Sequence, residues 1–202
     1  MPALRQQRME RFLQLMRPAQ GAAILDVGGL PALNGVPGFW QGYVDAFEIT
    51  LLNLPGSFDR YSKAELAPYR LIEADACKCV TLSKRYDVVF SNSVVEHVGS
   101  SRRQERFASF IRSAAESFWV QTPSPFFPVE AHCDVPFWWS IPIQLRKKWI
   151  MSWRRSGEHF LANQMASTRP IGEKQLRQLL PNCTILTEHF LGFPKSLIAY
   201  GR

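Results

Sequence analysis

The chain has 202 residues, 46% of them hydrophobic, which is enough to build one substantial core and excludes a predominantly disordered protein. Its formal net charge of +7 suits nucleic acid, an anionic membrane surface or an acidic small molecule, and selects none of them. Charged side chains interrupt the first residues, so we expect neither a signal peptide nor a membrane span there. We therefore expect a single domain over residues 1–202, located in the cytoplasm.

Short apolar runs alternate with helix-like segments along the chain. Such alternation is typical of strands joined by helical crossovers into a mostly parallel sheet. A helix is expected over residues 101–115, because its apolar side chains recur at helical spacing with charges on the other face. The expected strands in this part of the chain are residues 22–27, 47–53, 69–74, 86–91 and 117–121.

The later part of the chain begins with a long interruption of this alternation. A segment rich in proline and aromatic residues starts at Thr122, and a basic helix-like stretch follows through Trp153. A helix over 172–180 and two strands, 183–190 and 196–200 joined by residues 191–195, complete the chain. We predict an α/β, Rossmann-like fold: a seven-stranded, mostly parallel sheet with helices on both faces and an antiparallel last strand.

Polar residues and glycines follow the first expected strand, in the order Asp26-Val-Gly28-Gly29. Open α/β sheets bind ligands at the carboxyl ends of their strands, and glycine lets the backbone approach a ligand closely. The dinucleotide pattern G-x-G-x-x-G is absent, because Leu30 and Pro31 stand where further glycines would be. Taken alone, the turn fits a ligand site and a purely conformational turn about equally.

Further polar residues follow the next strands at the spacing of successive βα units. Asn53 and Leu54 follow the second strand, Asp75 and Ala76 follow the third, and the string YDVVFSNSVVEHV covers the fourth strand and the residues after it. Because the carboxyl ends of parallel strands meet at one edge of the sheet, we expect these residues to converge there.

At these residues the chain resembles the class I S-adenosylmethionine-dependent methyltransferases, in particular the small type-11-like group. The match runs from about Ala22 to Gln121, and the strings TPSPFFPVEAH from Thr122 and FLGFPKSLIAY from Phe190 also look like that group. The resemblance implies S-adenosylmethionine as cofactor and S-adenosylhomocysteine as product. From the cysteine spacing we expect no metal.

Residue by residue, the resemblance implies four parts of a cofactor site. One departure from the family concerns the ribose, where an aspartate or glutamate usually accepts from both hydroxyl groups and Asn53 offers a single carbonyl oxygen. By resemblance, Asp26, Gly28 and Gly29 line the methionine side, Asn53 with Leu54 meets the ribose, Asp75 and Ala76 border the adenine, and Ser91, Asn92 and Ser93 close the methionine end.

Methyl transfer asks little of an enzyme, because the sulfonium is already activated and holding the nucleophile in line supplies most of the effect. A general base is optional. Our candidates are Glu130 and His132, in the loop after the fifth strand, with His97 beside Glu96 where the helix after the fourth strand is expected to open. For His132 a role in backbone hydrogen bonding is an equal alternative, and for His97 it is the favoured one.

Residues 137–155 combine four tryptophans with five cations. The favoured interpretation is a lid over the acceptor, within an insertion at about 122–169. A second is a helix that contacts an anionic membrane surface, with Leu145, Trp149, Ile150 and Trp153 on one face and Arg146, Lys147 and Arg154 elsewhere. Nucleic-acid binding is disfavoured, because no recognisable RNA-binding module accompanies the segment.

These observations favour a methyltransferase that acts on a small acceptor, apolar or lipid-linked. An enzyme of the same fold that uses S-adenosylmethionine without methylating an acceptor, for instance in a cyclisation, is the first alternative. A non-catalytic binding protein that has kept the fold is the second. Four scattered cysteines fit neither a disulfide framework nor zinc spacing, and nothing in the sequence indicates the oligomeric state.

Overall fold

A computed structural model describes residues 2–33, 36–130 and 132–202. By its internal contacts the chain forms two compact units. The first, here called the N-terminal unit, contains residues up to Asn92, residues 106–120 and the last three residues. The second, the C-terminal unit, contains residues 93–105 and 121–199. The expectation of a single domain over the whole chain stays a prediction.

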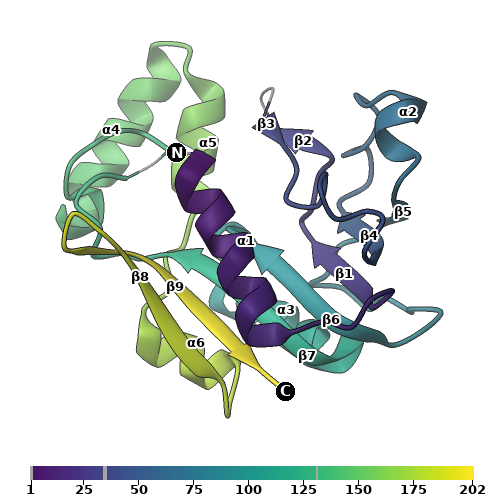
Figure 1. The fold of residues 1–202 in the computed structure, drawn as a ribbon. Helices are drawn as coiled ribbons and strands as arrows, with labels where there is room; N and C mark the ends of the chain where they lie inside the picture. The colour runs from purple at the N-terminus through teal and green to yellow at the C-terminus, as the bar shows by residue number, and fades with distance from the viewer. Residues whose placement is uncertain (1, 34–35, 131) are drawn as a thin grey trace. The chain divides into compact units, whose positions relative to one another are not determined.

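Seven strands form one sheet in the order β5-β4-β1-β6-β7-β9-β8 (Figure 1). β1 pairs in parallel with β4 and β6, and β4 pairs in parallel with β5, while the last strands are antiparallel. This confirms the predicted α/β architecture. The strands are β1 (Ala23–Val27), β4 (Glu48–Asn53), β5 (Arg70–Glu73), β6 (Tyr86–Asn92), β7 (Ala115–Pro123), β8 (Thr184–Phe190) and β9 (Phe193–Gly201).

The helices include several that the sequence pattern did not predict, above all α1 and α5. Within α1, Met9, Phe12 and Met16 are buried and recur at helical spacing, but charged residues between them mask the pattern. In the part of the chain that the structure describes, no helix is both long enough and apolar enough to cross a bilayer. The remaining elements are α1 (Pro2–Met16), β2 (Ala32–Leu33), β3 (Val36–Pro37), α2 (Lys63–Leu66), α3 (Ser101–Ala114), η1 (Trp138–Ser140), α4 (Ile143–Arg155), α5 (His159–Ser167) and α6 (Glu173–Leu179).

The connection between β8 and β9 is shorter than the sequence indicated. We expected residues 191–195 to join the two strands, but β9 begins at Phe193, so that Leu191 and Gly192 form the turn. Both have positive φ, 50° and 81°, as a two-residue type I′ hairpin requires. The prolonged strand accounts for the difference, because Pro194 and Lys195 lie within β9.

Phe12 of α1 is the centre of the aromatic core in the N-terminal unit. Its side chain is fully buried, and its ring meets Trp40, Phe90 and Trp119 edge-on, with centroids 5.8, 5.2 and 5.6 Å away. Edge-to-face pairs of this kind stabilise beyond the area that they bury. Phe12 therefore attaches α1 to β6 and β7 of the same unit.

Replacing Phe12 with Ala is expected to lower the free energy of unfolding by about 3–5 kcal/mol, because it opens a cavity among three rings. The measurement is urea unfolding followed by circular dichroism. Phe160→Ala is the control, since Phe160 is 82% exposed, and it should change stability by no more than about 0.5 kcal/mol. Equal effects of the two variants would refute this role of Phe12.

Candidate functional site

The glycine turn after β1 is shaped by the chain's own geometry. Gly28 has φ +85°, in the region that glycine adopts without strain, and its N–H donates to the Leu52 carbonyl at 2.7 Å. A Cβ on Gly29 would come within 2.4 Å of Asp26 Oδ2. Both glycines are therefore needed for the turn itself, and Gly29 leaves room for the Asp26 carboxylate.

Asp26, at the end of β1, is a buried carboxylate with one strong donor. Its Oδ2 accepts a hydrogen bond from Trp40 Nε1 at 2.8 Å, and its side chain is 4% exposed. Burial raises the pKa of Asp26 to about 7, although the Trp40 hydrogen bond and the nearby Arg5 cation act in the opposite direction. Asp26 thus changes charge near neutral pH.

Asn53, at the end of β4, links that strand to the glycine turn. Its Nδ2 donates to the Gly29 carbonyl at 3.1 Å, while its Oδ1 accepts from the Leu54 N–H at 2.8 Å and the Ser57 hydroxyl at 3.2 Å. An amide oxygen has two lone pairs, and both are used here. A ribose hydroxyl at Asn53 would have to compete with these two donors.

The other predicted cofactor residues of the N-terminal unit follow β5 or end β6. Asp75 Oδ1 accepts from the Cys77 N–H at 2.9 Å, and Ala76 is buried. Ser91 is buried and donates to the Val27 carbonyl at 3.0 Å, which joins the ends of β6 and β1. Asn92 Oδ1 accepts from Arg8 at 2.7 Å. Ser93 belongs to the C-terminal unit, where its hydroxyl donates to Gln121 Oε1 at 2.8 Å.

Helix α1 adds a group that sequence reasoning missed. The Arg5 guanidinium lies over the Phe39 ring, 4.0 Å from its centroid, and is near enough to Asp26 to affect its pKa. Its Nε is buried and has no acceptor among the residues that the structure describes. A buried donor without an acceptor carries a desolvation cost, which an anionic ligand group would offset. No local signal in the sequence distinguishes Arg5 from Arg8 or Arg11.

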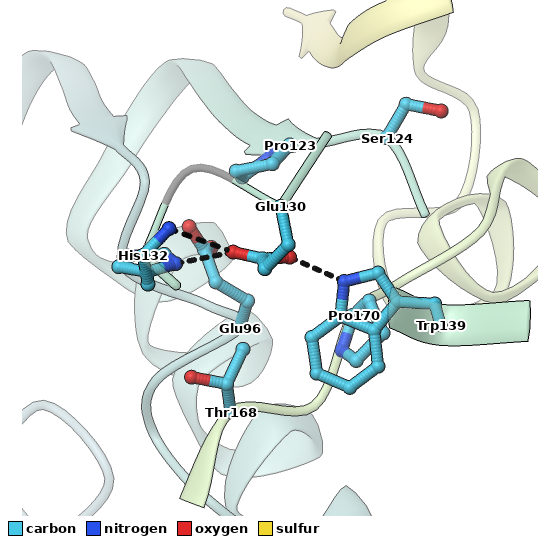
Figure 2. A pocket seen from close by; sticks show the side chains of 8 residues that line it. All are labelled: Glu96, Pro123, Ser124, Glu130, His132, Trp139, Thr168 and Pro170. Carbon is cyan, nitrogen blue, oxygen red and sulfur yellow. Dashed lines mark hydrogen bonds and ion pairs between the residues drawn. The ribbon is translucent and has the colours of Figure 1, made fainter. Parts of the chain in front are cut away.

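A small cavity of about 10 Å³ lies within the C-terminal unit (Figure 2). We call it the Glu96 pocket. It includes two of the predicted catalytic residues, Glu130 and His132, and adds Glu96, which the sequence analysis named only as a neighbour of His97. The pocket is lined by Glu96, Pro123, Ser124, Glu130, His132, Trp139, Thr168 and Pro170.

Glu130 and His132 form a hydrogen-bonded pair. His132 Nδ1 lies 2.5 Å from Glu130 Oε1, and Trp139 Nε1 donates to Glu130 Oε2 (Figure 2). Burial alone would raise the pKa of Glu130, but the hydrogen bonds from His132 and Trp139 hold it below the usual value. The hydrogen bond to Glu130 raises the pKa of His132 against the effect of burial. Glu130 therefore fixes the ring through Nδ1 and makes it more basic.

Glu96 has fewer hydrogen-bond donors than Glu130. The side chain is 2% exposed, and Oε2 accepts from the Thr122 hydroxyl at 3.1 Å. Oε1 is buried and receives no hydrogen bond from any described residue. Burial raises the pKa of Glu96 to about 7, although the hydrogen bond from Thr122 lowers it.

His97 lies in a turn rather than at the start of a helix, because α3 begins only at Ser101. Its Nδ1 is 3.1 Å from Thr168 Oγ1, and that hydroxyl donates to the Gln164 carbonyl at 2.8 Å. Thr168 must therefore accept from Nδ1–H, which leaves the lone pair on Nε2, 3.8 Å from Glu96 Oε1. Burial lowers the pKa of His97 to about 4, so the ring is neutral at neutral pH.

Three tryptophans of residues 137–155 pack together, with Trp138 at the centre. This side chain is 1% exposed, and its ring lies 5.8 Å from that of Trp149 and 5.3 Å from that of Trp153. On α4, Lys147 and Arg154 are exposed, whereas Arg146 is half-buried. It donates to the Ile141 carbonyl at 3.0 Å and lies over the Trp139 ring. Of the expected apolar face of α4, Trp153 is half-buried against Trp138, whereas Leu145 and Trp149 are 47% and 45% exposed.

No protein-family model matches the sequence, and a comparison with curated proteins gives no match. The fold is nevertheless shared with solved methyltransferases. Phosphoethanolamine N-methyltransferase 2 of Haemonchus contortus, in complex with phosphomonomethylethanolamine and S-adenosylhomocysteine, is 13% identical with a TM-score of 0.58. The match covers 90% of this chain but only 38% of that protein.

Two further structures match over most of both chains. N-methyltransferase NodS from Bradyrhizobium japonicum WM9, in complex with S-adenosylhomocysteine, is 11% identical with a TM-score of 0.57, covering 96% of this chain and 85% of NodS. The N-terminal domain of EvdMO1, with S-adenosylhomocysteine bound, is 15% identical with a TM-score of 0.58. The match covers 97% of this chain and 79% of that domain. This chain therefore has the fold of the class I S-adenosylmethionine-dependent methyltransferases.

Asp26→Asn is expected to flatten the pH dependence of stability. Because the folded protein binds this proton more tightly than the unfolded chain, the free energy of unfolding falls as pH rises from 3.8 to about 7. Glu96 adds a slope of the same sign, so the variant should keep part of it. Urea unfolding across this range measures the slope. Asp45→Asn, which changes an exposed carboxylate, should leave it intact, and an unchanged slope for Asp26→Asn would contradict the argument.

Glu130→Gln is expected to lower the pKa of His132, because the carboxylate that stabilises the imidazolium is replaced by a neutral amide. An NMR titration of the four histidine rings gives this pKa directly. Glu105→Gln is the matched control, since Glu105 is exposed on α3, and it should leave His132 unchanged. The same His132 titration in both variants would show that Glu130 does not hold the ring.

Proposed function

We propose that the protein is an S-adenosylmethionine-dependent methyltransferase that transfers a methyl group to a small-molecule acceptor. The observation that carries the proposal is the seven-stranded sheet with a glycine turn after Asp26, in a fold shared with methyltransferases whose structures contain S-adenosylhomocysteine. When bound, the cofactor supplies a methyl group that the sulfonium has already activated.

The N-terminal unit offers groups that fit such a cofactor. Arg5 supplies a buried cationic donor that needs an acceptor, as the carboxylate of a methionyl group would provide. Asp26 supplies a carboxylate for donors on the ligand, and Gly28 keeps the backbone close to the strand ends. Asp75 with Ala76 would border the adenine, and Asn53 with Leu54 would meet the ribose. The Ser91 hydroxyl already donates to Val27, so its part would be structural.

The C-terminal unit offers groups for the acceptor. Because Glu130 holds His132 through Nδ1, Nε2 would take the proton that the acceptor nucleophile loses. His97, neutral and hydrogen-bonded to Thr168, would line the site rather than titrate. Residues 122–169 would form the acceptor-facing segment within one catalytic domain.

Of the interpretations of residues 137–155, the acceptor-facing one has the most support. Trp138 stacks with Trp153 and packs against Trp149, and Trp139 donates to Glu130. Trp138 and Trp139 are therefore not free to insert into a membrane surface or to stack on bases, whereas Trp149 is 45% exposed.

Calorimetric titration with S-adenosylmethionine and with S-adenosylhomocysteine tests the cofactor. Saturable binding of both is expected. Arg5→Met should weaken binding by roughly ten-fold or more, because it removes the charged donor and keeps the aliphatic stem. Arg11→Met, on the exposed side of the same helix, should bind as the wild type does. Failure of both ligands to bind at high micromolar concentration would refute the proposed cofactor, and equal affinity of the two variants would refute the role of Arg5.

A further inference from the structure

We propose that the Glu96 pocket binds an amino group, as its ammonium, so that the acceptor is an amine-bearing small molecule. The pocket, its charges and its unpaired acceptors come from the described residues alone. Only the statement that the ligand is the methyl acceptor rests on the proposed function.

Hydrogen-bonding capacity is the first argument. Glu130 already receives donors at both oxygens, from His132 and Trp139. Glu96 Oε1 receives none from the described residues, and the His97 Nε2 lone pair lies 3.8 Å from it. Glu96 Oε1 and His97 Nε2 are therefore both available hydrogen-bond acceptors, and a ligand group with several donors would satisfy them. A primary ammonium presents three N–H donors and no acceptor.

Charge is the second argument. A protonated His132 would only balance the charge of Glu130, and His97 is neutral. The Arg169 guanidinium is exposed to solvent, where its charge is screened, and it donates to the Ala166 and Thr168 carbonyls. An ionised Glu96 therefore leaves one excess negative charge in a buried place, which is costly unless a cation or a proton compensates it.

The raised pKa of Glu96, about 7, agrees with this charge balance, because a proton takes the place of the cation when no ligand is bound. An arriving ammonium would displace that proton. Binding should therefore release a proton to the buffer at and below neutral pH, and the affinity for an amine should rise as the pH passes through about 7.

Size is the third argument. A cavity of about 10 Å³ is near the lower limit for a single water molecule. A primary ammonium group is of that size, whereas a quaternary ammonium is much larger. Pro123 and Pro170 line the pocket and limit how far it can widen, because proline has little backbone freedom. The pocket therefore suits the end of an amine.

Methylammonium chloride and methanol are the matched probes, since they are similar in size and differ in charge. NMR signals of the His97 and His132 rings report binding, and calorimetry in two buffers of different ionisation enthalpy counts the protons released. We expect methylammonium to shift both rings saturably with release of a proton, and methanol to shift neither. No shift from methylammonium would overturn the proposal. Equal shifts from the two probes would also overturn it, and would indicate a site for a hydroxyl group.

Glu96→Gln removes the charge and nearly preserves the shape. It should weaken methylammonium binding roughly ten-fold or more and abolish the proton release. Glu105→Gln, which changes an exposed carboxylate of the same unit, should bind as the wild type does. Equal affinity of the two variants would overturn the proposal. If Glu96→Gln does not fold, as circular dichroism would show, the comparison of the two probes on the wild type decides alone.

These measurements need no cofactor. Binding of methylammonium without binding of S-adenosylmethionine would leave an amine site and refute the methyltransferase proposal. Binding of the cofactor without binding of methylammonium would refute the amine and leave the methyltransferase proposal intact.

Discussion

A buried carboxylate must find hydrogen-bond donors or take up a proton, and this constraint organises both units of the protein. Three acidic side chains are buried among the described residues: Asp26, Glu96 and Glu130. Their surroundings differ in how far donors compensate for lost water. Glu130 has two strong side-chain donors and keeps its charge, whereas Asp26 and Glu96 have one each, and their pKa values rise to about 7.

The donors for these carboxylates come to a large extent from tryptophan. Trp40 donates to Asp26 and Trp139 donates to Glu130. An indole ring brings a large apolar surface together with a single N–H, so it can pack in a core and still satisfy a carboxylate. Trp40 does both, since its ring also contacts Phe12 and Phe90. These two tryptophans are therefore explained by the structure of the chain itself, without a membrane or a nucleic acid.

The strands of the seven-stranded sheet could be predicted from the sequence because their signal is local. Runs of β-branched and aromatic residues such as those of β6 predict buried strands wherever they occur. The proximity of Glu130 and His132 could be predicted for the same reason, since the two residues are two positions apart in one loop.

The rest of the candidate site depends on contacts between distant residues. Trp40 meets Asp26 across 14 positions, and Thr122 meets Glu96 across 26. Glu96 looked like an ordinary polar residue after a strand, and only its burial shows that one of its oxygens lacks a donor. Arg5 is similar, because a basic residue on a helix is normally solvated and its buried Nε is a property of the packing.

Asn53 stabilises the glycine turn in a way that a carboxylate could not. A carboxylate at the end of β4 could accept from Leu54 and Ser57, but it could not donate to the Gly29 carbonyl. The amide does both, and it ties the glycine turn to β4 where Leu30 and Pro31 replace further glycines. Both lone pairs of Oδ1 are occupied by these donors. A ligand hydroxyl that bound Oδ1 would therefore have to displace Ser57 or Leu54.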